Sequence, residues 1–386
     1  MISTTARSIL TPVALLRLVL GWCAIVALML AGPLLDGAVP APVLVIALAL
    51  IIGVILVCAF GVVHEAEHLA RRLGDPYGSL VLTLSIVLIE VVLISAVMLG
   101  PGHQATIARD SVMAVSMIIL NGVIGLCLLV GGVKRGDMEH NRTGASAYLA
   151  LLIVLSSLAF ALPALIGRDG SYLPGQEVAI IVLTLALYAF FLFRQMGAQA
   201  DDFREVDPHL AAVSGSRGEG ASLQERPSIT RVIAEHRAEI GLRLALLIVT
   251  VLPIVLLSHD MATLLDDGLG RVGAPVALAG ILIAMIVFLP ESITSVRAAL
   301  RGEIQRVSNL CHGALVSTVG LTIPAVLVIG ALTGQAVVLA ESPVNLLLLG
   351  VTLALSVTTF AAQMVTATHG AAHLVLFAVY GIAVFS

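Results

Sequence analysis

Two glutamates stand in the middle of long apolar stretches of the sequence. Glu90 lies within GSLVLTLSIVLIEVVLISAVML (78–99), and Glu291 lies within GAPVALAGILIAMIVFLPESITSV (273–296). An ionisable group in hydrocarbon costs roughly 2.5–3.5 kcal/mol on insertion scales, so intramembrane carboxylates usually mark ion or proton pathways. A carboxylate in such surroundings binds either a proton or a metal cation. The pair therefore predicts a site at which Glu90 and Glu291 bind cation and protons in turn.

Oxygen-bearing side chains accompany both glutamates. Hard cations such as Ca²⁺ and Na⁺ prefer carboxylate, carbonyl and hydroxyl oxygens. Pro290, directly before Glu291, also frees a backbone carbonyl about one turn earlier, because proline has no amide proton to donate. For each Ser or Thr the alternative is a hydrogen bond to its own helix. The candidate auxiliary ligands are Thr83, Ser85, Asn121, Ser292, Asn309, Ser317 and Thr318.

A second motif, HEAEH (64–68), has the H-E-x-x-H spacing of zinc metalloproteases. On a helix this spacing places two imidazoles on one face, with Glu65 as a general base. An intramembrane protease also needs a third ligand, and the only candidate, LDDG (265–268), is predicted to lie in a loop across the membrane. The favoured interpretation is a polar vestibule leading to Glu90, and a merely solvated helix end stays open. The vestibule residues are His64, Glu65, Glu67 and His68.

The composition excludes a soluble protein. Of the 386 residues, 59% are hydrophobic and only 11% are charged, against about 25% charged in soluble domains. The net charge of −4 comes without a basic stripe, so no nucleic-acid partner is expected. The four cysteines lack paired spacing, which argues against a disulfide framework or a thiolate metal site. We expect no cofactor: the partners are the lipid bilayer, protons and a transported cation (Ca²⁺, Na⁺ or K⁺).

The apolar segments predict an all-α polytopic membrane protein with about eleven transmembrane helices. Segments long enough to span about 30 Å begin near residues 13, 43, 77, 110, 146, 177, 241, 274, 307, 343 and 371. Sixteen of the 20 lysines and arginines then fall on the side of the N-terminus. By the positive-inside rule this predicts a plasma (inner) membrane protein whose N-terminus and helix 6–7 linker are cytoplasmic. Whether the acidic stretch 201–207 in that linker is regulatory stays open.

Helices 2 to 6 and 7 to 11 predict two repeats of five. An odd number of spans inserts the second copy upside down, which is the inverted-repeat plan of secondary transporters. The predicted units are an N-terminal extra helix (1–40), repeat 1 (41–195), a cytoplasmic linker (196–240) and repeat 2 (241–386). Glu90 and Glu291 then correspond. Rocking one repeat against the other would move cation and protons in opposite directions, without a covalent step.

Two histidines, His369 and His373, are predicted in the last helix, and Gln363 lies at the end of the helix before it. A histidine near its ordinary pKa could sense pH. A packing role is the favoured interpretation for both.

Three stretches resemble the bacterial calcium/proton antiporters of the ChaA type, in the cation/calcium exchanger superfamily. They are HEAEHLARRLGDPYGSLVLTLSIVLIE (64–90), TIARDSVMAVSMIILNGVIGLCLLVGG (106–132) and LPESITSVRAALRGEIQRVSNLCHGALVSTVGLTIPAVLVIG (289–330). The resemblance implies eleven helices in two inverted repeats and exchange of Ca²⁺, in some members Na⁺ or K⁺, for protons. It also implies that Glu90 and Glu291 are the two intramembrane acids.

The sequence departs from this family at one point. Related exchangers place a Gly-Asn pair shortly before each acid, whereas this chain has Ile86-Val87 and Val287-Phe288. Fewer neutral oxygens weaken the expectation of Ca²⁺ selectivity and leave Na⁺ and K⁺ open. A channel is less favoured, because no repeated filter sequence is present.

Overall fold

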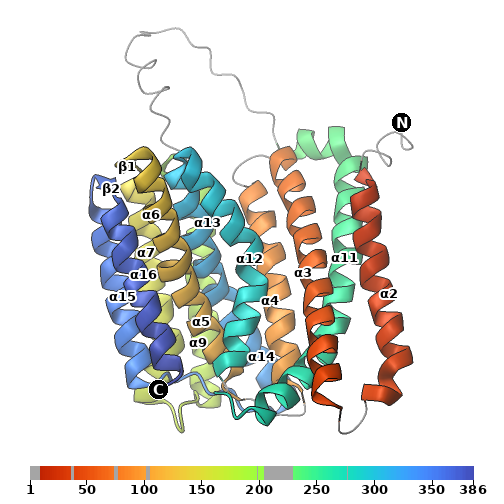
Figure 1. Cartoon of the computed structure of the whole chain (residues 1–386). Helices are drawn as coiled ribbons and strands as arrows, with labels where there is room; N and C mark the ends of the chain where they lie inside the picture. Colours follow the sequence, from red (N-terminus) through yellow and green to blue (C-terminus); the bar gives the residue numbers. More distant parts are fainter. Residues whose placement is uncertain are drawn as a thin grey trace.

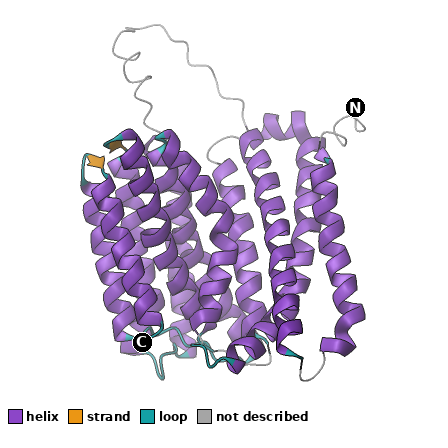
Figure 2. Ribbon diagram, in the orientation of Figure 1, coloured by secondary structure: helices purple, strands orange, loops and turns teal. Residues whose placement is uncertain are grey.

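The computed structural model describes residues 9–35, 39–73, 77–100, 105–197, 199–203, 229–275 and 277–386. In these ranges the chain is almost entirely helical (Figure 2). The helices run between an upper face, where α3 ends at Leu73, and a lower face, where α15 begins at Pro343 (Figure 1).

Eleven helical spans cross the molecule within the described ranges. Eight are single helices: α2 (Pro12–Leu35), α3 (Ala41–Leu73), α4 (Tyr77–Met98), α9 (Pro174–Met196), α11 (Ile229–Arg271), α12 (Ala277–Arg301), α15 (Pro343–Ala361) and α16 (Ala367–Val384). Ten of the spans are long and apolar enough to cross a membrane, and α4 contributes a shorter apolar stretch, Thr83–Met98. The predicted number of helices and the all-α class are confirmed.

The other three spans contain π-helical stretches that the sequence did not predict. They are α5 (Ile107–Met117), η1 (Ile118–Val123) and α6 (Ile124–Arg135); α7 (Arg142–Ser156), η2 (Ser157–Ala161) and α8 (Leu162–Ile166); and α13 (Ile304–Ser317), η4 (Thr318–Thr322) and α14 (Ile323–Thr333). A π-helical turn inserts one residue into the hydrogen-bond ladder and often lies at a functional site. Asn121 lies in η1 and Thr318 in η4.

Short elements complete the upper face. Strands β1 (Met138–Glu139) and β2 (Met364–Val365) pair antiparallel there, and the 3₁₀ turn η3 (Ala200–Phe203) follows α9.

The structure differs from the predicted linker at its end. Helix α11 begins at Ile229, with non-helical backbone at His236, so part of 196–240 is helical. The extension is held by charges: Glu239 pairs with Arg72 at the end of α3, and Arg243 lies one turn further along α11. The outer bounds of the predicted repeats stay a prediction.

The two repeats pack reciprocally. Helix α12 of the second repeat lies against the span α5–η1–α6 of the first, and α4 of the first lies against α13–η4–α14 of the second. Small residues allow the close approaches that membrane helices use: a Cβ at Gly370 of α16 would lie 2.4 Å from the backbone nitrogen of Leu129 in α6. Helices α2, α3 and α11 form a layer at one side (Figure 1). Glu90 and Glu291 are thereby brought to the middle of the bundle.

Candidate functional site

The two predicted carboxylates lie on helices that pack against each other. Glu90 is on α4 and is 0% exposed; Glu291 is on α12 and is 7% exposed. The two side chains are within electrostatic range of each other. Each repeat therefore contributes one buried carboxylate to a shared region.

Glu90 is held across the repeat boundary. The hydroxyl of Thr318, in η4, donates to Oε2 of Glu90 at 2.7 Å. Thr322, fully buried in the same stretch, lies beside the carboxyl without a hydrogen bond. The other oxygen of Glu90 has no hydrogen-bond partner. Of the candidate ligands, Thr318 is the one that contacts a glutamate through a hydrogen bond in the described structure.

Glu291 differs from Glu90 because neither of its oxygens has a hydrogen-bond partner. Three of the four carboxylate oxygens in this region are therefore buried and unpaired. Buried polar atoms are nearly always hydrogen-bonded in proteins, and an exception calls for an explanation such as a proton or an ion. The arrangement suits groups that are protonated at one stage and bound to a cation at another.

Three candidate serines bond mainly to their own helices, as the alternative interpretation held. Ser85 donates to the carbonyl of Val81 and Ser292 to that of Phe288, both at 2.7 Å. Ser317 donates to Gly313 at 2.8 Å and also contacts the Tyr188 hydroxyl at 2.9 Å. Thr83 is half-buried on α4.

Asn309 lies away from the glutamates, near the upper face. Its Nδ2 donates to the carbonyl of Phe203 in η3, and its Oδ1 accepts from Gln305. It therefore anchors the start of the linker. Of the acidic stretch, Asp201 and Asp202 lie in η3, while Glu205 and Asp207 fall outside the described residues.

The four residues of the predicted vestibule have different surroundings in the structure. Glu65 is buried and forms a 2.7 Å ion pair with Arg243 of α11. His64 is exposed, and its ring contacts that of His68 edge to face at 4.6 Å. Glu67 is half-buried and within electrostatic range of Glu291. Glu67 therefore connects the vestibule to the carboxylate pair through its charge.

The geometry gives the zinc-protease alternative no support. The ion pair with Arg243 occupies the carboxylate that would act as the base. Asp267, in the proposed third-ligand segment, lies at the lower end of α11 and pairs with Arg271 at 2.6 Å. Across the described ranges no three His, Cys, Asp or Glu side chains are grouped as a metal site.

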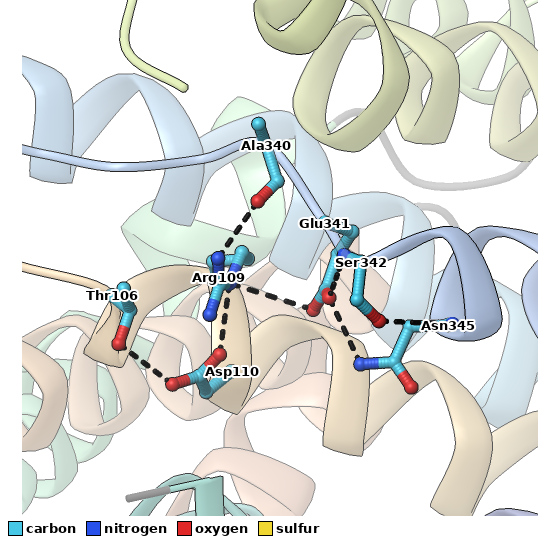
Figure 3. A network of polar contacts seen from close by, with 7 residues as sticks. All are labelled: Thr106, Arg109, Asp110, Ala340, Glu341, Ser342 and Asn345. Atoms are coloured by element: carbon cyan, nitrogen blue, oxygen red, sulfur yellow. Dashed lines mark hydrogen bonds and ion pairs between the residues drawn. The ribbon is translucent and has the colours of Figure 1, made fainter. Parts of the chain in front are cut away.

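A polar network at the lower face escaped the sequence analysis. Arg109 of α5 donates to the carbonyl of Ala340 at 2.8 Å and pairs with Asp110 at 2.9 Å and with Glu341 at 3.7 Å (Figure 3). Burial raises the pKa of Glu341, and the nearby Asn345 and Arg109 partly oppose that shift. We call this network the lower closure; its members are Thr106, Arg109, Asp110, Ala340, Glu341, Ser342 and Asn345. The sequence places Arg109-Asp110 at the start of the predicted helix near residue 110, but no local pattern identifies Glu341 as the partner of Arg109.

A second unpredicted network surrounds Asn121. Its amide bonds to Thr352 of α15 and to His373 of α16, and all three residues are 0% exposed. His373 is thus buried as the packing interpretation expected, but it is also hydrogen-bonded to a candidate ligand.

Known proteins match the chain along most of its length. The family described as sodium/calcium exchanger protein matches residues 43–197 and 242–386. The sodium-potassium/proton antiporter ChaA of Escherichia coli (strain K12) is 31% identical over 352 residues, which are 89% of this chain and 90% of that protein. The protein y4hA of Sinorhizobium fredii (strain NBRC 101917 / NGR234) is 35% identical over 339 residues, 87% of this chain and 88% of its own.

A solved structure shares the fold. Native YfkE superposes with a TM-score of 0.69 at 16% identity, covering 96% of this chain and 99% of YfkE. Another YfkE structure is described as that of a Ca²⁺/H⁺ antiporter protein. The family matches cover both helical halves, and two relatives match nearly the whole chain. This chain belongs to the sodium/calcium exchanger protein family, and it is a multi-pass membrane transporter, not an enzyme.

Proposed function

We propose that this protein is a secondary active antiporter that exchanges a metal cation, Ca²⁺, Na⁺ or K⁺, for protons by alternating access. Glu90 and Glu291 bind the cation and the protons in turn. The observation that carries the proposal is the pair of buried carboxylates, one from each repeat, with three of their four oxygens unpaired.

The coupling follows from elementary electrostatics. Burial disfavours an ionised carboxylate, and a bound cation favours it. Each glutamate is therefore neutral when it carries a proton and ionised when it holds the metal. Because both ligands use the same oxygens, they exclude each other. Reorienting the site in each loaded state then moves them in opposite directions.

Few neutral oxygen ligands accompany the two glutamates, and their number bears on which cation is transported. Ca²⁺ takes six to eight oxygen ligands, and Thr318 is the neutral side chain bonded to Glu90. ChaA is named for sodium, potassium and protons, and YfkE for Ca²⁺ and protons. Transport assays with each of the three cations decide between them.

The proposed orientation places the upper face, the N-terminus and the helix 6–7 linker in the cytoplasm of a cell with an inner membrane. The support is the positive-inside rule. Sixteen of the 20 lysines and arginines fall on the side of the N-terminus in the predicted topology, against Arg109, Arg168 and Arg271 on the other side.

Proton efflux from proteoliposomes tests the proposal. A pH-sensitive dye inside the vesicles reports exchange when Ca²⁺, Na⁺ or K⁺ is added in turn. Wild-type protein should move protons with at least one cation, and Glu90→Gln and Glu291→Gln should each abolish the signal. Glu303→Gln is the matched control, since Glu303 pairs with Arg306 at the upper face. Full exchange in either of the two site variants would refute the proposal.

A further inference from the structure

The side-chain amide of Asn121 is fixed at both ends. Its Nδ2 donates to Oγ1 of Thr352 at 2.8 Å, and its Oδ1 lies 3.1 Å from Nδ1 of His373. The two partners belong to α15 and α16, whereas Asn121 belongs to η1. The amide of the first repeat is therefore held by two helices of the second.

The directions of these bonds follow from the surrounding groups. The Thr352 hydroxyl faces Sδ of Met117 at 3.6 Å, so its oxygen is free to accept from the amide NH₂. The amide oxygen then accepts from Nδ1–H of His373, which also lies beside the carbonyl of Leu120. Nε2 of His373 accepts from the Thr359 hydroxyl at 3.2 Å. The tautomer is assigned from this network, and a neutral imidazole satisfies every member.

The inverted repeats show what Asn121 could do instead. When Arg109 is aligned with Arg306, Asn121 falls opposite Thr318. Both lie in π-helical stretches of the corresponding spans, and both are fully buried. Thr318 bonds across the repeat boundary to Glu90. The symmetric contact would run from Asn121 to Glu291.

That symmetric contact is not made. The stretch η1 packs against α12, which carries Glu291. Yet the amide of Asn121 is bonded to Thr352 and His373, and both oxygens of Glu291 are left unpaired. The amide oxygen of Asn121 is occupied as long as His373 holds it.

We propose that His373 is a positioning residue that controls when the amide oxygen of Asn121 becomes a ligand for the transported cation beside Glu291. While the His373–Asn121 bond is intact, the Glu291 side lacks this neutral oxygen. Release of the bond supplies it without changing the charge of the site. The inference rests on the proposed antiport function and deepens it.

The test is the apparent KM for the cation in proteoliposomes. His373→Leu frees the amide oxygen, and a hydrogen bond of this kind contributes about 1 kcal/mol net. The KM should therefore fall about three- to tenfold, with a lower maximal rate because the cation is released more slowly. His373→Asn offers a donor close to the position of Nδ1, and it should restore a KM within about twofold of the wild type.

A second variant and a double-mutant cycle separate positioning from a general structural effect. Thr352→Val releases the NH₂ end of the same amide. The amide can then turn away from His373, so this variant should also lower the KM, by a smaller factor, and the test does not depend on His373→Leu folding. In an Asn121→Ala background, His373→Leu should leave the KM unchanged, because the oxygen it frees is absent. Unfolding temperatures in detergent confirm that each variant is folded.

Two results would overturn the inference: a wild-type KM in both His373→Leu and Thr352→Val, or an equal KM shift with and without Asn121. Failure of the antiport proposal looks different. In that case the wild-type protein shows no cation-driven proton flux, or Glu90→Gln and Glu291→Gln remain active, whatever residue stands at position 373.

Discussion

The two faces of the molecule are closed by corresponding backbone segments with different side-chain chemistry. At the lower face, Arg109 at the start of α5 holds Ala340 and Glu341, just before α15. At the upper face, Gln305 at the start of α13 accepts from the backbone N–H of Asn141, just before α7, at 2.8 Å. We call the second contact the upper closure; its members are His140, Asn141, Gln305, Asn309 and Phe360.

The segments match closely in their local structure. Ser342 caps α15 through a bond from the N–H of Asn345, and Asn141 caps α7 in the same way. In the lower closure one arginine faces two buried carboxylates; the upper closure uses an amide and a histidine whose Nε2 contacts the Phe360 carbonyl at 3.0 Å. The two inverted repeats thus share the same backbone arrangement at their closures, while each face has its own electrostatics.

The largest effect should come from removing the cation of the lower closure. Arg109→Met leaves Asp110 and Glu341 buried without a positive partner, and breaking a buried ion pair costs about 3 kcal/mol or more of unfolding free energy. Arg306→Met is the matched change at the upper face, where the pair with Glu303 is half exposed and contributes about 0–1 kcal/mol. Unfolding in detergent measures the loss of unfolding free energy in each variant. Equal losses in Arg109→Met and Arg306→Met would contradict the proposed difference between the two faces.

A smaller effect is expected at the upper closure. Gln305→Leu leaves the N–H of the half-buried Asn141 without its acceptor, which costs about 1 kcal/mol. Gln363→Leu, at an exposed position, should change the unfolding free energy by less than about 0.5 kcal/mol. If the two glutamine variants unfold at the same temperature, the neutral closure contributes nothing to stability.

The smallest effects should appear in the pH dependence, with opposite signs at the two faces. Burial raises the pKa of Glu341, so its contribution to stability is full below the ordinary glutamate pKa and declines as the pH rises through the raised value. Burial, with a smaller effect of Arg142, lowers the pKa of His140. Its contribution is full above about pH 6.5 and is lost as the pH falls.

Two substitutions by a neutral residue measure how Glu341 and His140 make stability depend on pH. Relative to the wild type, Glu341→Gln should become more stable as the pH rises from 4.5, and His140→Gln should become more stable as the pH falls below 6.5. Unfolding temperatures between pH 4.5 and 8 would show both trends, and slopes of the same sign would mean that the closures titrate alike.

Much of the fold could be predicted because membrane helices are recognised in a sequence by their length and apolarity. The eleven spans were predicted within a few residues of their starts, and Ile229 as the start of α11 is the main exception. The candidate site was less accessible. Among several hydroxyl candidates the sequence offered no way to single out Thr318, because its contact with Glu90 crosses more than two hundred residues.

The sequence alone was enough to predict a bundle of spanning helices with one acid, Glu90 or Glu291, near the middle of an apolar span in each half. The length of an apolar segment and the presence of an isolated charge within it are local properties of the sequence. A segment that spans the bilayer must be apolar over most of its length, so both features can be recognised without knowing the fold. The polar pairings are visible only in the folded molecule: Thr318 with Glu90, His373 with Asn121, and Arg109 with Glu341. Those pairings depend on the rotation and packing of helices from different repeats, and no run of neighbouring residues encodes them.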